Sequence, residues 1–183
     1  MYVFTLPIIA LRLLTYAPTT ELATHHPFYD THLPKNVLVG SGNVVKVSCI
    51  GSCRSLYAGD YHTSPSAPDT PLPVRWMSWE ALFLGHFSSR SDVWSFGVTL
   101  WEMLTLARTQ PHEKMSDEAV IDNLTHSYHD DGQQVLLPQP MLCPKEIYDL
   151  MCECWRRDEA DRPNFRDIHV FLQRKNHGYS PQA

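Results

Sequence analysis

Four stretches in the second half of the chain repeat apolar residues at helical spacing. The first, residues 92–106, is apolar almost all the way round, which predicts a fully buried helix. The others carry apolar side chains on one face, as is typical of helices that cover a core. They lie near residues 116–124, 144–155 and 164–172. The pattern predicts a mainly α domain.

Polar residues and a proline mark where these helices should begin. Ser91 or Asp92 can cap the buried helix, and Ser116 and Asn164 can cap two of the others. Pro144 stands where a first helical residue is expected, because its missing N–H is not needed there.

Two short β-branched runs precede the helices. Residues 37–39 and 44–47 flank a Gly/Asn-rich turn, which predicts a β-hairpin. Residues 62–73 are rich in Pro, Ser and Thr, and we expect them to be irregular and exposed.

The first 17 residues are apolar, and three interpretations stand. A secretory signal lacks support, because no basic residue precedes the apolar run and Arg12 interrupts it. A membrane span needs roughly 20 apolar residues, so this run is short for one. A buried helix or a mis-joined coding segment fits better.

Composition excludes some partners and sites. Of the 183 residues, 43% are hydrophobic, which allows a packed core, and the net charge of −5 argues against nucleic acid as a partner. The five cysteines are odd in number and lack the spacing of zinc ligands, so we expect reduced thiols. Cys152 and Cys154 are expected to pack within a helix.

Four motifs follow one another along the chain. They are RWMSWE at 75–80, SDVWSFG at 91–97, CWRR at 154–157 and DRP at 161–163. Together they resemble the C-terminal lobe of a protein tyrosine kinase. LYAGDY at 56–61, Trp79 and LPQP at 137–140 are similar to the discoidin domain receptors. The resemblance divides the chain into a poorly matched segment (1–32), a kinase C-lobe (33–172) and a polar tail (173–183).

The resemblance implies structural roles. Glu80 should pair with Arg162 as a bidentate ion pair. Asp92 should hold the catalytic-loop backbone, and it can also act as a plain helix cap. The segment that would support the substrate is Leu72, Pro73, Val74, Arg75 and Trp76.

The positions that carry the family's chemistry depart from its pattern. Thr31 occupies the position of the family's catalytic Asp, and Asp30 occupies the position of the Arg before it. Cys49 occupies the position of the Asp that binds magnesium. Asn36 matches a magnesium ligand, but it can equally be a turn residue. We expect this chain to lack phosphate transfer.

The sequence also shows no Gly-rich loop and no Val-Ala-x-Lys strand, so an N-lobe is expected to be missing. Either a decayed pseudokinase that serves as a non-catalytic interaction module or an incomplete gene model explains this pattern.

The resemblance implies ATP-dependent phosphorylation of protein tyrosine as the family activity, with ATP and Mg²⁺ as cofactors. It implies protein substrates and phosphotyrosine-binding domains as partners, and collagen only through an ectodomain that this chain lacks. It places the parent receptor's kinase on the cytoplasmic side of the plasma membrane and this fragment in the cytoplasm. Tyr57 and Tyr61 match activation-loop tyrosines, and we expect them to be exposed and open to phosphorylation by an active relative. The alternative is that both rings pack onto the helical core.

Overall fold

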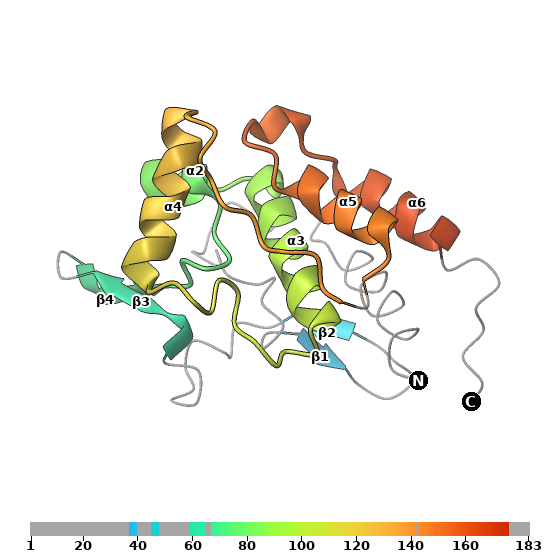
Figure 1. Ribbon diagram of the computed structural model, residues 1–183, viewed down its shortest axis with the longest axis horizontal. Helices are drawn as coiled ribbons and strands as arrows, with labels where there is room; N and C mark the ends of the chain where they lie inside the picture. The colour runs from blue at the N-terminus through green and yellow to red at the C-terminus, as the bar shows by residue number, and fades with distance from the viewer. Residues whose placement is uncertain (1–36, 40–44, 48–58, 65–66, 142, 176–183) are drawn as a thin grey trace.

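The computed structural model describes residues 37–39, 45–47, 59–64, 67–141 and 143–175. Within these ranges the protein is mainly α-helical and has two short antiparallel hairpins (Figure 1). The predicted mainly α architecture is confirmed. Its helices are α2 (Trp79–Leu84), α3 (Ser89–Leu104), α4 (Asp117–His129), α5 (Lys145–Cys154), the short 3-10 helix η5 (Glu159–Asp161) and α6 (Phe165–Lys175).

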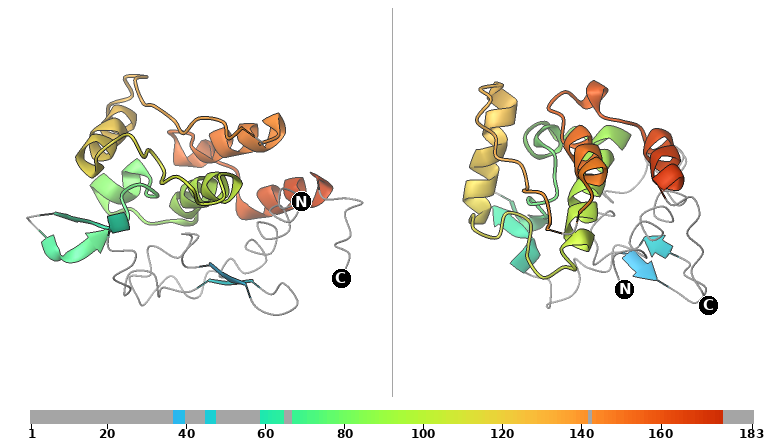
Figure 2. Two further views of the ribbon diagram at one scale, coloured as in Figure 1. Left: turned by 60° about the horizontal axis from the view of Figure 1, so that its bottom comes forward. Right: turned by 45° about the vertical axis from the view of Figure 1, so that its right-hand side comes forward.

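Helix α3 lies at the centre, with α4 on one side and α5 and α6 on the other (Figures 1 and 2). Nine of its 16 residues are buried, all of them between Ser91 and Trp101. The prediction of a buried helix is therefore confirmed for most of residues 93–101, whereas Asp92, Ser95 and the last turn are half-buried and Leu106 is exposed beyond the end of the helix. At Gly97 the helix lies close to the end of α5, because a Cβ placed there would meet Cys154 and Trp155.

The caps partly agree with the prediction. Ser116 accepts a hydrogen bond from Ala119 N at 3.2 Å, and Asn164 accepts one from Asp167 N at 2.9 Å. Pro144 is the N-cap of α5, whereas it was predicted to be the first residue of that helix.

The cap of α3 was predicted wrongly. Ser88 is the N-cap, and its Oγ accepts hydrogen bonds from the backbone N of Arg90 and of Ser91 at 3.1 and 3.3 Å. Ser91 Oγ in turn accepts from Ser88 N at 2.8 Å, so the two serines form a capping box. The helix therefore begins at Ser89, before the predicted start at Ser91 or Asp92. The apolar pattern did not reveal this first turn because residues 89–91 are polar.

The first hairpin was predicted correctly. Strands β1 (Val37–Val39) and β2 (Val45–Val47) are antiparallel, with Val37 opposite Val47 and Val39 opposite Val45.

The second hairpin was not expected. β3 (His62–Ser64) pairs with β4 (Ala67–Leu72) in an irregular register, in the segment predicted to be irregular. Pro68 and Pro71 lie in β4. A two-stranded ribbon leaves one edge of each strand unpaired, and a proline is tolerated where its missing N–H is not needed.

Candidate functional site

The predicted substrate-supporting segment joins β4 to α2 and is largely buried. Val74 is 1% exposed and Trp76 is 2% exposed. The backbone turns tightly, since Val74 N donates to Leu72 O and Trp76 N donates to Pro73 O, both at 3.0 Å. This segment is a packed platform rather than a free loop.

Helix α3 anchors the end of this platform at Trp76. The indole Nε1 donates to Glu102 Oε2 at 2.9 Å, and Ser95 Oγ donates to the carbonyl oxygen of Trp76 at the same distance. Both partners lie on α3, one near its middle and one near its end. The platform therefore cannot shift without disturbing the central helix.

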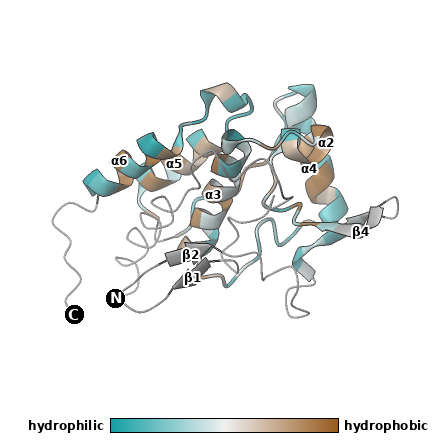
Figure 3. Ribbon diagram, turned by 180° about the vertical axis from the view of Figure 1, so that it is seen from behind, coloured by the Kyte–Doolittle hydropathy of each residue, from teal (hydrophilic) through white to brown (hydrophobic). Residues whose placement is uncertain are grey.

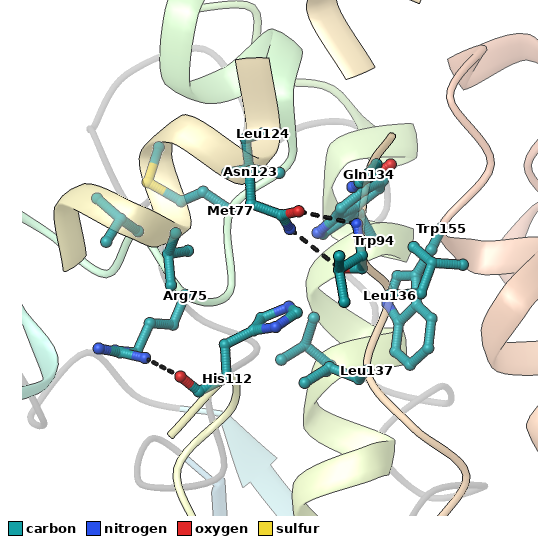
Figure 4. A pocket seen from close by; sticks show the side chains of 14 residues that line it. Arg75, Met77, Trp94, His112, Asn123, Leu124, Gln134, Leu136, Leu137 and Trp155 are labelled. Carbon is teal, nitrogen blue, oxygen red and sulfur yellow. Dashed lines mark hydrogen bonds between the residues drawn. The ribbon is translucent and has the colours of Figure 1, made fainter. Parts of the chain in front are cut away.

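Arg75 points toward the connection between α3 and α4. Its Nε donates to Asp117 Oδ1 at 2.9 Å, and its Nη atoms donate to the carbonyl oxygens of Pro111, His112 and Met115 at 2.7–2.9 Å. The bond to His112 is drawn in Figure 4. The side chain is 7% exposed. Arg75 therefore holds the start of α4 against the platform, and any effect on a substrate would come through this positioning.

Glu80 and Arg162 form the predicted ion pair. Nη1 lies 2.5 Å from Oε1 and Nη2 lies 3.0 Å from Oε2, and the two side chains are 3% and 0% exposed. The Arg162 guanidinium also donates to the carbonyl oxygens of Arg156 and Arg90, and it lies 5.0 Å from the ring centroid of Trp94. These bonds satisfy both charges, as burial requires. The pair joins the start of α2 to the segment before α6.

Tyr61 is buried, which corrects the expectation that its side chain is exposed. It is 9% exposed and belongs to the same apolar cluster as Trp76. Its neighbour Asp60 accepts a hydrogen bond from Gln110 Nε2 at 3.0 Å. Ring burial and this bond hold the segment against the helical part of the protein.

The remaining predicted chemistry lies outside the described residues. This applies to Thr31, Asn36, Cys49 and Tyr57. Asp92 is half-buried in the first turn of α3, but the catalytic loop that it was predicted to hold is also outside the described ranges.

A small cavity next to the platform was not predicted. It measures about 20 Å³, room for about one water molecule. His112 lines it, as does Asn123, whose amide bonds the backbone N and O of Val135 at 2.8 and 3.0 Å (Figure 4). Burial, and then the charge of Arg75, lower the pKa of His112 from 6.5 to about 4, so the ring is neutral at physiological pH. The sequence alone does not predict this lowered pKa, because its causes are burial and a residue far from His112 in the chain.

The described residues offer neither a metal centre nor a reactive thiol. No group of three His, Cys, Asp or Glu side chains among them could hold a metal ion. Cys143, Cys152 and Cys154 are free, and burial raises the pKa of Cys143 to about 11 and that of Cys154 further. Such thiols stay protonated and unreactive.

In the part of the chain that the structure describes, no helix is long and apolar enough to cross a bilayer.

Residues 33–172 match the family model for protein tyrosine and serine/threonine kinases. The epithelial discoidin domain-containing receptor 1 of Rattus norvegicus is 46% identical over 151 residues, which cover 82% of this chain and 16% of that receptor. The discoidin domain-containing receptor tyrosine kinase B of Caenorhabditis elegans is 40% identical over 141 residues, covering 76% of this chain and 17% of that protein. The BDNF/NT-3 growth factors receptor of Gallus gallus is 39% identical over 152 residues, which cover 83% of this chain and 17% of that receptor.

The chain thus spans about 16–17% of the length of these relatives. Its motifs, its helical architecture and the family match agree with one another. The chain belongs to the protein tyrosine kinase family, with discoidin domain receptor tyrosine kinases among its relatives, and its mainly helical fold is that of a kinase C-terminal lobe.

Proposed function

We propose that this chain is the substrate-side part of a receptor-type tyrosine kinase domain and that, as written, it does not transfer phosphate. The observation that carries the proposal is a contrast between scaffold and chemistry. The platform at residues 72–76 and the Glu80–Arg162 pair are well formed. At the two positions where phosphoryl transfer needs a carboxylate, the sequence has Thr31 and Cys49.

The residues at these positions do not fit Mg²⁺·ATP. Magnesium prefers carboxylate and phosphate oxygens in an octahedral arrangement. Asn36 would supply one amide oxygen, and Cys49 would supply a soft sulfur that this hard cation does not favour. Thr31 has no carboxylate to accept the proton of a substrate hydroxyl. We therefore derive no step through the nucleotide.

The remaining function is binding, and it follows the family. Protein substrates and phosphotyrosine-binding domains are the proposed partners, on the cytoplasmic side of a membrane in the parent receptor. Tyr57 and Tyr61 are the proposed phosphorylated residues. Because Tyr61 is only 9% exposed, its segment would have to lift away from the core before another kinase could reach it.

The proposal is tested by titrating Mg²⁺·ATP into the purified full chain by isothermal titration calorimetry, with an active discoidin domain receptor kinase domain as the positive control. We expect heat of binding from the control and none from this chain at the same nucleotide concentrations. Magnesium-dependent binding by this chain at an affinity similar to that of the control would contradict the proposal. ATP binding that does not depend on magnesium would agree with the missing metal ligands and would contradict only the expectation that no nucleotide binds.

A further inference from the structure

Helices α2 and α4 leave an aromatic surface uncovered. Phe83 is 36% exposed, Leu84 58% and Tyr128 46%. The ring centroid of Tyr128 lies 5.9 Å from that of Trp79 and 6.0 Å from that of Phe83, in edge-to-face geometry. Figure 3 shows α2 in hydrophobic colouring beside α4. We call Trp79, Phe83, Leu84 and Tyr128 the α2–α4 surface.

A hydrogen bond and a cation–π contact hold the ring of Trp79 in place. Trp79 Nε1 donates to the carbonyl oxygen of Arg157 at 3.0 Å, and the Arg157 guanidinium lies 5.8 Å from the Trp79 ring centroid. Arg157 Nε also donates to Ser127 O at 2.7 Å, which joins the segment after α5 to the last turn of α4. A partner would therefore meet a pre-organised surface, so binding would require little ordering of side chains.

The chemistry of this surface is that of a protein-binding site. Exposed apolar patches with a polar rim mark interaction surfaces, and Trp, Tyr and Arg carry a large share of interface energy. A soluble protein has little other reason to leave three large apolar side chains of one cluster in water.

The rim of the surface is acidic at both ends. At the C-terminal end of α4, Asp130 is 69% exposed and Asp131 is 34% exposed, and the negative end of the helix dipole adds to their field. Hydrogen bonds from His126 and from Gln133 N lower the pKa of Asp131, so it is ionised. Beyond the end of α2, Glu159 lies 3.6 Å from His86.

Beside these three carboxylates lies the guanidinium of Arg157. Arg157 lies 3.3 Å from Asp130 and balances part of its charge. The rim is therefore net negative when the histidines are neutral. A second copy of this chain would bring two acidic rims together, whereas a basic partner would meet complementary charge.

We propose that the α2–α4 surface docks a segment of a partner protein in which a large apolar side chain is flanked by lysine or arginine. The apolar side chain would pack on Phe83, Leu84 and Tyr128, and the flanking cations would face Asp130 and Glu159. This inference goes beyond the proposed function, because the surface exists whether or not the chain transfers phosphate.

The test measures binding of a fluorescently labelled peptide to the full chain by anisotropy. The probe is a short synthetic peptide with a Phe-Leu pair flanked by lysines, and its control carries glutamates in place of the lysines. We expect the lysine peptide to bind at least about tenfold more tightly than the glutamate peptide, and less tightly as salt is raised. Equal binding of the two peptides, or no binding of either, would overturn the proposal.

Variants locate the binding site. Phe83→Ala combined with Leu84→Ser should weaken binding of the lysine peptide by about tenfold or more, as expected for loss of central contacts. Asp130→Asn should weaken it severalfold and reduce its salt dependence, and it keeps the left-handed backbone that asparagine tolerates (φ 56°). Met141→Ser is the matched control, because Met141 is 98% exposed and belongs to the segment before α5.

Two results would count against this assignment even if the peptide binds. One is an equal loss in Met141→Ser and in the Phe83/Leu84 variant, which would indicate nonspecific apolar contact. The other is a concentration-dependent dimer in sedimentation that Tyr128→Ser abolishes, which would show a second copy to be the occupant. Thermal melts of each variant establish that it is folded, and Tyr128→Ser replaces the double variant if that one is not.

Discussion

The guanidinium of Arg162 grips the carboxylate of Glu80 across 82 residues of sequence, with N–O distances of 2.5 and 3.0 Å and almost no solvent exposure of either group. This pair ties the segment before α6 to α2, directly after the platform at residues 72–76. Removing one partner would leave the other as a buried charge without its counter-ion.

Arg162→Ala should therefore lower the free energy of unfolding by about 3–5 kcal/mol, the range for breaking a well-buried pair. Arg162→Lys should also be strongly destabilising, because an ammonium group cannot make the two parallel bonds. Urea denaturation measures both. The matched control is Lys145→Ala, which breaks an ion pair whose lysine is 80% exposed and should change stability by no more than about 1 kcal/mol. Similar effects of Arg162→Ala and Lys145→Ala would contradict the role of the buried pair.

Gly97→Ala should destabilise the protein even though alanine is the better helix former. A Cβ at this position would lie 2.7 Å from Trp155 Nε1 and 2.9 Å from Cys154 Cβ, so α3 and α5 would have to move apart. Overpacking of this kind costs typically about 1–3 kcal/mol. Gly59→Ala is the control, since nothing lies within 4 Å of a Cβ there. A gain in melting temperature for Gly97→Ala would show that the helices are not in close contact.

Ser88→Ala tests the corrected start of α3. The substitution removes the oxygen that accepts from Arg90 N and Ser91 N, and loss of an N-cap typically costs about 1 kcal/mol. Ser89→Ala, one residue on and exposed, should have little effect. If Asp92→Ala proved the more damaging change to helix stability and Ser88→Ala were silent, the cap assignment would fail.

His112 should make the protein less stable in mild acid. Its pKa is about 4 in the folded protein and 6.5 ordinarily, so the unfolded chain binds the proton more readily between these values. This contribution is fully present above about pH 6.5 and is lost as pH falls toward about 4, by up to ~3 kcal/mol. His112→Asn, which keeps a residue tolerant of the positive φ of 52°, should flatten that part of the profile. An unchanged slope in urea denaturation across this range would contradict the assignment.

Local signals predicted much of the fold. Helices α3 to α6 follow apolar periodicity, Ser116 and Asn164 cap as expected, and the Glu80–Arg162 pair followed from the family motif. The second hairpin, helix α2 and the Ser88 cap were missed, because proline content and apolar spacing carry little information about short elements.

The features of the candidate site that were missed depend on sequence-distant partners. Tyr61 is buried through contact with residues of the helical core, and Arg75 is engaged by carbonyl groups 36–40 residues away. The lowered pKa of His112 likewise depends on burial and on the charge of Arg75, which lies far from it in the sequence. A tyrosine beside a Gly-Asp pair looks like an exposed loop residue until those contacts are known.

We propose that a chain with a well-formed helical C-lobe core lacks phosphate-transfer chemistry because of Thr31 and Cys49. The most direct test is a phosphorylation assay with the purified full chain, Mg²⁺, radiolabelled ATP and a tyrosine peptide, beside an active discoidin domain receptor kinase domain. We predict that label in the peptide stays at the level of a no-protein blank. Magnesium-dependent labelling of peptide tyrosine well above that blank, and absent from a heat-denatured sample, would contradict the account.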